Sequence, residues 1–390
     1  MSETRLPPLS LYVHLPWCIA KCPYCDFNSH KAGDSPPRSQ YIEALKLDFQ
    51  AQSGSVSGRI VETVFLGGGT PSIFAPEEIQ QILVSARAEF DIAVDAEITM
   101  EANPGTVECG ALAGYRAAGI NRLSIGAQSF DRDSLQRLGR IHGPDEILSA
   151  VAEARSAGFD SFNLDLMYGL PGQTLAMAQQ DLATAVELMP EHISYYQLTL
   201  EPNTVFYSRP PAAMPDDESA FAMQEACHAS LQEAGFGRYE ISAFARPGFE
   251  CRHNLNYWQF GDYLAAGAGA HGKITDAGGI IRRYQRPAHP MSYIKAAKKR
   301  PAGTELRELG EDDIVFEYML NVLRLPAGFT IADFEQRTGL AYELVRERLE
   351  GCADAGTLQQ LNDQSWQPTE LGLRFGNDLQ AHFLPSRGAT

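Results

Sequence analysis

Residues 11–27, LYVHLPWCIAKCPYCDF, place three cysteines directly after a short apolar run. Cys18, Cys22 and Cys25 have the spacing C-x3-C-x2-C, and no fourth cysteine lies close by. Three thiolates can hold three irons of a [4Fe–4S] cluster and leave the fourth iron open to a small molecule. The spacing therefore favours an iron–sulfur cluster that takes part in chemistry as well as supporting the fold.

A zinc knuckle and a disulfide loop are the alternatives for the same three thiols. Structural zinc sites are closed by four ligands, and only His14 or His30 is near enough in sequence to complete such a set. Seven cysteines in 390 residues do not make a disulfide framework. The four scattered cysteines are predicted to be small core residues: Cys109, Cys227, Cys251 and Cys352.

The length and the charge of the chain limit the number of domains and the kinds of partner that it can have. A chain of 390 residues is too long for one compact core, so two or three domains are expected. Its 32 basic and 49 acidic residues give a net charge of −17, which opposes nucleic acid as a partner. The start, MSETRLPPL, has no signal-peptide pattern, and no apolar run is long enough to span a membrane. We therefore expect a cytoplasmic protein without a transmembrane segment.

Strand-like and helix-like segments alternate about six times in the first 235 residues. Such alternation predicts an α/β fold with a parallel sheet and helices outside it, here a partial (β/α)6 barrel; a flat, doubly wound sheet is the alternative. The predicted strands are 10–15, 62–69, 97–104, 121–130, 162–172 and 192–200. The predicted helices are 39–51, 76–90, 108–118, 131–138, 143–157, 175–188 and 216–234.

Two changes in composition divide the chain into three predicted parts. The barrel occupies residues 1–235, and an extension rich in glycine and aromatic residues occupies 236–303. Residues 304–390 contain a helix, a short helix pair and two short strands joined by a turn. This order is typical of a winged-helix-like α+β module.

Polar residues follow several of the predicted strands, where functional residues of parallel strand–helix folds gather. Each has an ordinary structural explanation by itself, because a glycine triplet permits a tight turn and a single acid or arginine often faces solvent. Their shared position at one rim, beside the cysteine loop, favours a site. The residues are Gly68, Gly69, Thr70, Glu101, Gln128, Arg140 and Asp165.

Several stretches of the chain resemble the radical S-adenosylmethionine superfamily. These are the cysteine loop, FLGGGTPS, EANPG, GAQSFD, NLDLMYGLPGQT and HNLNYW, which together run from Tyr12 to Trp258. Within the superfamily they are similar to the branch of oxygen-independent coproporphyrinogen III oxidase and its heme-chaperone relatives. The resemblance implies that Cys18, Cys22 and Cys25 ligate a [4Fe–4S] cluster whose open iron takes the amino and carboxylate groups of S-adenosylmethionine.

The same resemblance implies which side chains contact the S-adenosylmethionine. Tyr12 and Tyr24 match positions that flank the nucleoside, and Gly68, Gly69 and Thr70 match the turn near the methionine amine. The remaining polar contacts fall on Glu101, Gln128, Arg140 and Asp165. These residue types suit a zwitterion and a ribose, which need an acid, a base and a hydrogen-bond acceptor.

Two features separate the chain from the oxidase. Phe27 stands where the oxidase has a further cysteine, and only 17 residues precede Cys18. The stretch HNLNYW, residues 253–258, instead matches a signature of the heme-chaperone branch.

That signature implies a heme site. His253 would be an axial ligand of the heme iron, Asn254 would orient its ring, and Tyr257 and Trp258 would offer flat surfaces to the porphyrin. A core histidine beside a structural Tyr-Trp pair is the alternative.

The function that follows is a heme chaperone rather than an enzyme. It is expected to bind the cluster, S-adenosylmethionine and heme, and to deliver heme to an acceptor such as a respiratory hemoprotein in a membrane complex. An electron donor for the cluster is a further expected partner. The alternative is a coproporphyrinogen III oxidase, in which an electron from the cluster cleaves S-adenosylmethionine and the radical formed decarboxylates porphyrinogen propionates.

Overall fold

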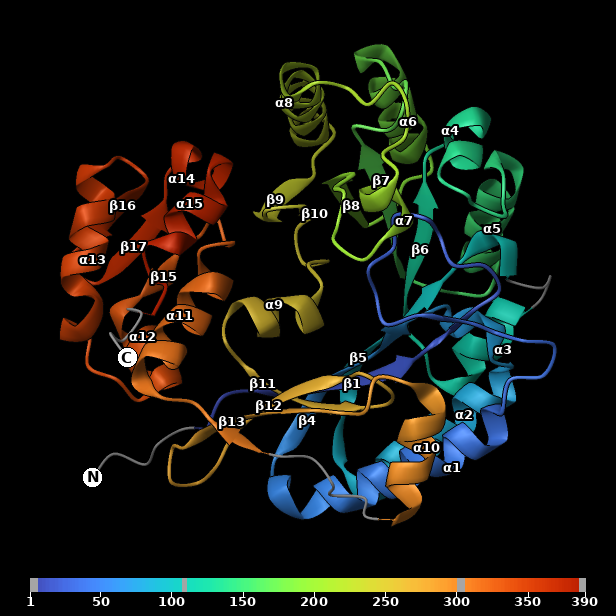
Figure 1. Ribbon diagram of the computed structural model, residues 1–390, viewed down its shortest axis with the longest axis horizontal. Helices are drawn as coiled ribbons and strands as arrows, with labels where there is room; N and C mark the ends of the chain where they lie inside the picture. The colour runs from blue at the N-terminus through green and yellow to red at the C-terminus, as the bar shows by residue number, and fades with distance from the viewer. Residues whose placement is uncertain (1–5, 107–110, 300–305, 386–390) are drawn as a thin grey trace.

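The computed structural model describes residues 6–106, 111–299 and 306–385, and Figure 1 shows how their elements are arranged. A sheet in the order β14-β13-β12-β11-β1-β4-β5-β6-β7-β8-β10-β9 forms its centre. The six strands expected from the alternation are present and pair in parallel. They are β1 (Leu9–Leu15), β4 (Ile60–Gly68), β5 (Asp91–Ala102), β6 (Arg122–Gln128), β7 (Ser161–Tyr168) and β8 (His192–Gln197).

Helices connect these strands and cover the outer face of the sheet (Figure 1). They are α1 (Arg38–Ser53), α2 (Pro76–Glu89), α3 (Ala111–Ala118), α4 (Arg132–Arg137), α5 (Pro144–Ser156), α6 (Leu175–Glu187), α7 (Val205–Ser208) and α8 (Asp217–Glu233). Single 3-10 turns lie at Gly54–Val56, Pro71–Ile73 and Pro104–Thr106. The first residues of the third helix predicted from sequence, 108–110, lie outside the described residues, as does Cys109.

Helix α2 illustrates how local sequence sets these elements. Pro76 occupies the first turn, where a missing N–H costs nothing, and Glu78 Oε2 accepts the Ala75 N–H at 2.8 Å. Arg87 lies in the last turn, where a cation suits the helix dipole. The face toward the sheet buries Ile79, Ile82, Leu83 and Ala86. Each of the three larger side chains contributes about 1.5–3 kcal/mol by leaving water.

The strands point apolar side chains toward the helices and polar ones into the barrel. In β1, Leu11, Val13 and Leu15 join the main hydrophobic core. Because side chains alternate along a strand, Ser10 and His14 face the other way and make hydrogen bonds inside the barrel. The interior of the barrel is therefore a polar lumen, and the apolar core lies between sheet and helices.

Residues 236–303 add strands to both edges of the same sheet. Beside β8 lies β10 (Ala243–Ala245), which is antiparallel to it, and β9 (Gly237–Glu240) pairs antiparallel with β10 at the edge of the sheet. Beside β1 lies β11 (Asp262–Ala266), a seventh parallel strand that the alternation did not predict because it is short and follows no long helix. The sheet continues through β12 (His271–Thr275) and β13 (Ile281–Gln285), and its last strand on this side, β14 (Arg307–Glu308), comes from beyond residue 303. Helix α10 (Pro290–Lys299) packs against α1.

Helix α9 (Arg252–Trp258) connects the two edges, between β10 and β11, and lies between the barrel and the C-terminal module (Figure 1). Leu255, Trp258 and Phe260 pack against the hydrophobic core of that module. The Arg324 guanidinium stacks 4.3 Å from the centre of the Trp258 ring, and Arg324 Nη2 forms an ion pair with Glu240 Oε2 at 2.9 Å. One short helix thus contacts both parts of the chain.

The C-terminal module is the predicted small sheet with helices. It contains α11 (Glu311–Val322), β15 (Phe329–Thr330), α12 (Ile331–Thr338), α13 (Glu343–Asp354), β16 (Leu358–Asn362), β17 (Ser365–Pro368), α14 (Glu370–Arg374) and α15 (Gly376–Ala381). Its strands pair antiparallel in the order β15-β17-β16. The three-part division of the chain stays a prediction, and its second boundary, 303/304, lies outside the described residues.

The scattered cysteines that the structure describes are buried. Cys227 lies in the main core, Cys352 lies in the core of the C-terminal module, and Cys251 precedes α9. No helix within residues 6–106, 111–299 and 306–385 is long and apolar enough to cross a membrane.

Candidate cluster and cofactor pocket

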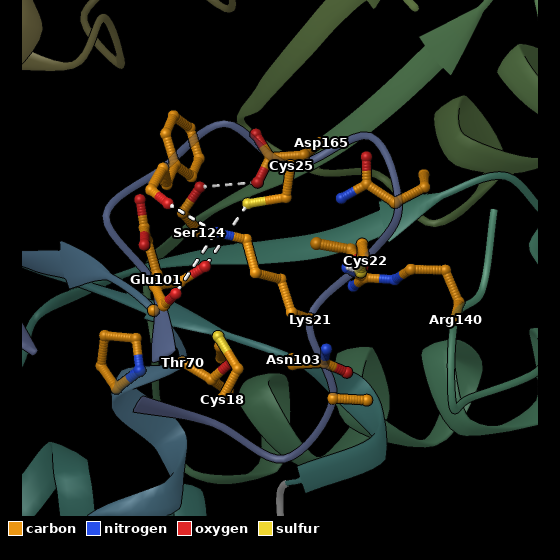
Figure 2. A pocket seen from close by; sticks show the side chains of 18 of the residues that line it. Cys18, Lys21, Cys22, Cys25, Thr70, Glu101, Asn103, Ser124, Arg140 and Asp165 are labelled. Carbon is orange, nitrogen blue, oxygen red and sulfur yellow. Dashed lines mark hydrogen bonds between the residues drawn. The ribbon is translucent and has the colours of Figure 1, made fainter. Parts of the chain in front are cut away.

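A pocket lies where the cysteine loop crosses the carboxyl ends of the parallel strands. Figure 2 shows Cys18, Cys22 and Cys25 on that loop, near Glu101 and Asp165 from the strands. Ten of the residues predicted from sequence line this pocket: Cys18, Cys22, Cys25, Tyr24, Gly69, Thr70, Glu101, Gln128, Arg140 and Asp165. The structure therefore brings together side chains that lie up to 147 positions apart in the chain.

The cysteine loop is held closed by hydrogen bonds to its own backbone and to distant segments. Its two ends pair as short parallel strands, β2 (Trp17–Cys18) and β3 (His30–Lys31). Lys21 Nζ donates to the carbonyls of Phe27 and Ser29, both at 3.3 Å. Asn28 Nδ2 donates to the carbonyls of residues 268 and 288, at 2.8 and 2.9 Å. These contacts fix the loop with its thiols toward the strand ends.

The three thiols are free, and their surroundings suit ligands of a cluster. Burial raises the pKa of Cys18 and of Cys25 above the ordinary thiol value. Two donors lie near them: Arg140 Nη1 is 3.6 Å from Cys22 Sγ, and Ser29 Oγ is 3.8 Å from Cys25 Sγ. Thiolate sulfur binds metal, and donors close to ligand sulfurs are common around metal–thiolate sites. The donor set therefore fits a [4Fe–4S] cluster.

The described residues contain no group of three His, Cys, Asp or Glu side chains arranged closely enough for one metal ion. A cluster bound through one thiolate per iron does not need its ligands to meet at one ion. The donor chemistry, rather than a preformed single-ion site, is what supports the cluster here.

Gly68 and Gly69, at the end of β4, have no room for a side chain because neighbouring groups lie too close. Gly68 has a φ of 111°, in the left-handed region, and a Cβ there would overlap the His14 imidazole. A Cβ on Gly69 would lie 2.7 Å from the Trp17 carbonyl oxygen. The Gly69 N–H and the Thr70 N–H donate to the carbonyls of Leu15 and Trp17, both at 2.8 Å. The turn therefore packs directly against the strand and loop that carry the cysteines.

Two half-buried acids face the pocket, Glu101 from β5 and Asp165 from β7, with β6 between these strands. Glu101 Oε2 accepts the Gly68 N–H at 2.9 Å, yet burial raises the pKa of Glu101 from 4.5 to about 7. Burial also raises the pKa of Asp165, although Asn163 Nδ2 and Ser124 Oγ donate to it at 2.7 and 3.1 Å. Buried carboxyls with raised pKa values are typical of sites that await a partner. An ammonium group and ribose hydroxyls are partners that would favour the ionised forms.

Gln128 contributes an amide to the pocket, and Arg140 contributes a cation. Gln128 has a φ of 68°, which is costly for a residue with a side chain, and its Oε1 accepts the Tyr196 hydroxyl at 2.8 Å. Arg140 Nη2 donates to the Gly126 carbonyl at 2.8 Å. Its buried Nε has no hydrogen-bond partner among the described residues. An unsatisfied guanidinium N–H beside the thiols fits a carboxylate ligand.

Two predicted contacts do not line the pocket. The Tyr12 hydroxyl forms a 2.9 Å hydrogen bond with His14 Nδ1, and the Tyr12 ring lies beside Phe65 in the barrel. Gly68 contributes the N–H that Glu101 accepts. Their roles toward S-adenosylmethionine stay predictions.

Sequence reasoning missed several polar residues of the pocket, among them Lys21, Ser124 and Tyr196. Lys21 lies between two of the predicted ligands. Ser124, Gly126 and Gln128 of β6 all line the pocket, and their spacing of two could have pointed to Ser124, although the pairing of β6 with β7 shifts register between Ile125 and Gln128. Tyr196 lies on the last predicted strand of the barrel, but nothing in its local sequence distinguishes it from a core tyrosine.

The predicted heme residues lie away from this pocket, on α9. His253 is only 1% exposed. Its Nδ1 forms a 2.8 Å hydrogen bond with Thr63 Oγ1, and its Nε2 forms a 2.9 Å hydrogen bond with the Tyr257 hydroxyl. Trp258 is covered by Arg324. Both ring nitrogens of His253 are therefore occupied here, and iron ligation by His253, which stays a prediction, requires one of these contacts to open.

The comparisons with known proteins agree with this fold and pocket. The family model described as the radical SAM superfamily matches residues 12–185, and the model described as the HemN C-terminal domain matches residues 309–375. The solved structure entitled "Coproporphyrinogen III oxidase (HemN) from Escherichia coli is a Radical SAM enzyme" superposes with a TM-score of 0.81 at 25% identity. That superposition covers 97% of this chain and 90% of the other. The predicted partial radical-SAM barrel with a C-terminal α+β module is thus confirmed.

Curated relatives narrow the class further. The heme chaperone HemW of Escherichia coli (strain K12) is 47% identical over 380 residues, which cover 97% of this chain and 99% of the relative. The heme chaperone HemW of Haemophilus influenzae is also 47% identical, with the same coverage. This chain belongs to the heme chaperone HemW family, which has the radical SAM fold.

Proposed function

We propose that this chain is a heme chaperone that holds a [4Fe–4S] cluster and S-adenosylmethionine, binds heme and passes it to an acceptor. One observation carries the proposal: the 47% identity to proteins named heme chaperones extends over nearly the whole length of both chains. The pocket adds chemical support, because three free thiols, two half-buried acids with raised pKa values and a partly unsatisfied arginine meet there.

The cofactor pocket gives each part of S-adenosylmethionine a complementary residue. Cys18, Cys22 and Cys25 would hold the cluster, which supplies an open iron and one-electron chemistry. Glu101 would accept the ammonium, and Asp165 would accept the ribose hydroxyls. Arg140, with its unpaired N–H, would take the carboxylate, and Gln128 is oriented by Tyr196 to present its amide.

Heme would bind through the residues of α9, with His253 as axial ligand. The geometry supports this only with a rearrangement, in which the Tyr257 hydroxyl leaves His253 Nε2. Burial lowers the pKa of His253 to about 3, so its imidazole is neutral and keeps a lone pair for iron. Asn254, Tyr257 and Trp258 would then lie along the porphyrin.

The proposal also indicates which kind of protein would receive the heme and in which compartment the transfer would take place. A chaperone for heme needs an apo-hemoprotein as acceptor, for which a respiratory membrane complex is our candidate, and an electron donor for its cluster. The free thiols suit the reducing cytoplasm. Phe27, 60% exposed, lines the pocket where the oxidase has a cysteine, which disfavours porphyrinogen decarboxylation.

Anaerobic reconstitution tests the function on one sample. The cluster-loaded protein should take up heme with a defined Soret band and pass it to apo-cytochrome b. It should form no decarboxylated product from coproporphyrinogen III. Absence of heme uptake would overturn the chaperone proposal, and product formation would favour the oxidase.

The His253 ligand is tested on the same sample. His253→Ala should abolish the Soret signature, whereas His382→Ala, a matched change at an exposed histidine of the C-terminal module, should leave it unchanged. If heme stoichiometry and spectrum survive in His253→Ala, the axial ligand is another residue while the chaperone function stands.

A further inference from the structure

A chain of four hydrogen bonds crosses the barrel lumen beneath the cofactor pocket. It starts at the N-terminus of α9 and ends on Asp165. The Cys251 N–H donates to the Tyr239 hydroxyl at 3.2 Å, and that hydroxyl lies 2.7 Å from His192 Nε2. His192 Nδ1 lies 2.7 Å from Asn163 Oδ1, and Asn163 Nδ2 donates to Asp165 Oδ1 at 2.7 Å. Apart from Asp165, none of these groups belongs to the pocket described above.

The register of two strands brings the members together. Asn163 and Asp165 are two positions apart on β7 and so point the same way into the lumen. In the parallel pairing with β8, Asn163 lies opposite His192 and Asp165 lies opposite Ser194. Tyr239 comes from β9, which follows β10 at that edge of the sheet. Asn163 and His192 are buried, at 2% and 1% exposure, so water does not compete for their hydrogen bonds.

The direction of each hydrogen bond is fixed by groups that can only donate or only accept. The Ser194 N–H donates to Asn163 at 2.9 Å, so the amide oxygen of Asn163 must lie on that side and its nitrogen must face Asp165. His192 Nδ1 meets the same oxygen and must therefore carry the proton. Burial lowers the pKa of His192 well below its ordinary value, so the ring is neutral and Nε2 accepts from Tyr239. Every bond thus donates toward Asp165.

Because all four hydrogen bonds donate toward Asp165, they strengthen the last one, from Asn163 to the Asp165 carboxylate. Each donor is polarised by the one before it, and this strengthens the final hydrogen bond to a carboxylate. Asn163 has all its amide hydrogen-bonding groups engaged, because Nδ2 also donates to Ser124 Oγ at 2.8 Å. It therefore cannot rotate without losing several bonds, and Asp165 keeps one orientation toward the pocket.

We propose that Asn163, His192 and Tyr239 are positioning residues that aim Asp165 at the ribose hydroxyls of the bound nucleoside. The inference rests on the proposed function, since it takes S-adenosylmethionine as the ligand of the pocket. It also ties the orientation of Asp165 to α9, because the chain begins at the backbone of that helix. Tyr239, 74 positions after Asp165 and on another strand, thus becomes a determinant of cofactor recognition.

The test measures selectivity for the ribose in the cluster-reconstituted full chain. Equilibrium dialysis gives Kd for S-adenosylmethionine and for its 2′-deoxyribose analogue, and their ratio reports the contact with the hydroxyl. We expect the wild-type protein to prefer S-adenosylmethionine about tenfold or more, as for a hydrogen bond to a charged group. Asn163→Ala should reduce this preference to about twofold, and Tyr239→Phe should reduce it by about threefold, with unchanged iron content in both.

Two histidine variants separate positioning from simple packing. His192→Asn places an amide nitrogen where Nδ1 was and should keep most of the preference. His192→Gln places its amide near the former Nε2 and should lose it. Tyr195→Phe, the same change as Tyr239→Phe but at a buried core tyrosine of β8, is the matched control and should leave the ratio unchanged.

The outcomes distinguish this inference from the proposed function. If the variants weaken both ligands equally, or leave both unchanged, the chain does not aim Asp165 and the inference is wrong. The inference is also wrong if the wild-type protein shows no preference for the ribose. If the reconstituted wild-type protein does not bind S-adenosylmethionine at all, the proposed cofactor, and with it the function, is what fails.

Discussion

Glu101→Gln should stabilise the cluster-free protein at alkaline pH while weakening its cofactor site. Loss of water around the wild-type carboxyl raises its pKa from 4.5 to about 7, and the negative charge of Asp165 adds to this rise. Glutamine keeps the shape of the side chain and an oxygen for the Gly68 N–H, which Glu101 Oε2 accepts at 2.9 Å. The variant therefore removes the cost of burying a charge without opening a cavity.

The sign and size of the effect follow from proton linkage. Below pH 4.5 the carboxyl is protonated in both the folded and the unfolded chain. Between pH 4.5 and about 7 the unfolded chain loses its proton while the folded chain keeps it, so the stability of the wild-type protein falls as pH rises. A change of one pKa unit corresponds to about 1.4 kcal/mol, so the rise from 4.5 to about 7 costs the wild-type protein at most about 3.5 kcal/mol above pH 7. Glu101→Gln avoids this cost.

Urea unfolding of the thiol-reduced, metal-free protein at pH 5 and pH 8 measures the difference. The variant should exceed the wild-type protein by less than about 1 kcal/mol at pH 5 and by about 2–3 kcal/mol at pH 8. Glu146→Gln is a control in which stability should change in the opposite direction. The Gly143 N–H lowers the pKa of the exposed Glu146, so the ionised side chain stabilises the folded protein at high pH and its replacement should lower stability there. A Glu101→Gln stability advantage that is absent at pH 8, or constant across pH, would refute the reasoning.

S-adenosylmethionine should bind the reconstituted variant at least tenfold more weakly, because the ammonium loses its counter-charge.

Three further predictions address the loop, the turn and α9. Cys22→Ser should lose the reconstituted cluster, whereas Cys352→Ser in the C-terminal core should keep it, as measured by iron and sulfide content. Gly69→Ala should lower the free energy of unfolding by about 2 kcal/mol or more and prevent cluster assembly, because its Cβ meets the Trp17 carbonyl at 2.7 Å; normal iron uptake would contradict this. Trp258→Ala removes a partly buried side chain packed against the C-terminal module and should cost about 2 kcal/mol in urea unfolding, with faster proteolysis between barrel and module.

Local patterns were sufficient to predict most of the barrel. Its six strands were found because each couples an apolar run to a turn and a helix, as β4 does with its glycine triplet and α2. The pocket residues were found because carboxyl ends of parallel strands meet at one edge. Glu101 and Asp165 lie 64 positions apart in sequence but on strands separated only by β6.

Sequence reasoning failed where contacts between distant segments decide the structure. Strand β11 is five residues long and becomes a seventh parallel strand only because the edge of β1 is free to pair with it. The HNLNYW stretch gives no sign from its composition that His253 bonds Thr63, or that Trp258 faces Arg324. The chain from Tyr239 to Asp165 was equally hidden, because its members come from three strands and become neighbours only through sheet register.

The hydrogen bonds of Asn28 have a consequence for biogenesis. The segment that bears the N-terminal thiols reaches its final form only when the carbonyls of residues 268 and 288 are available. During synthesis, roughly three-quarters of the polypeptide must leave the ribosome before those acceptors exist. Iron loading of a correctly shaped loop is therefore a late event, after most of the nascent chain has been translated.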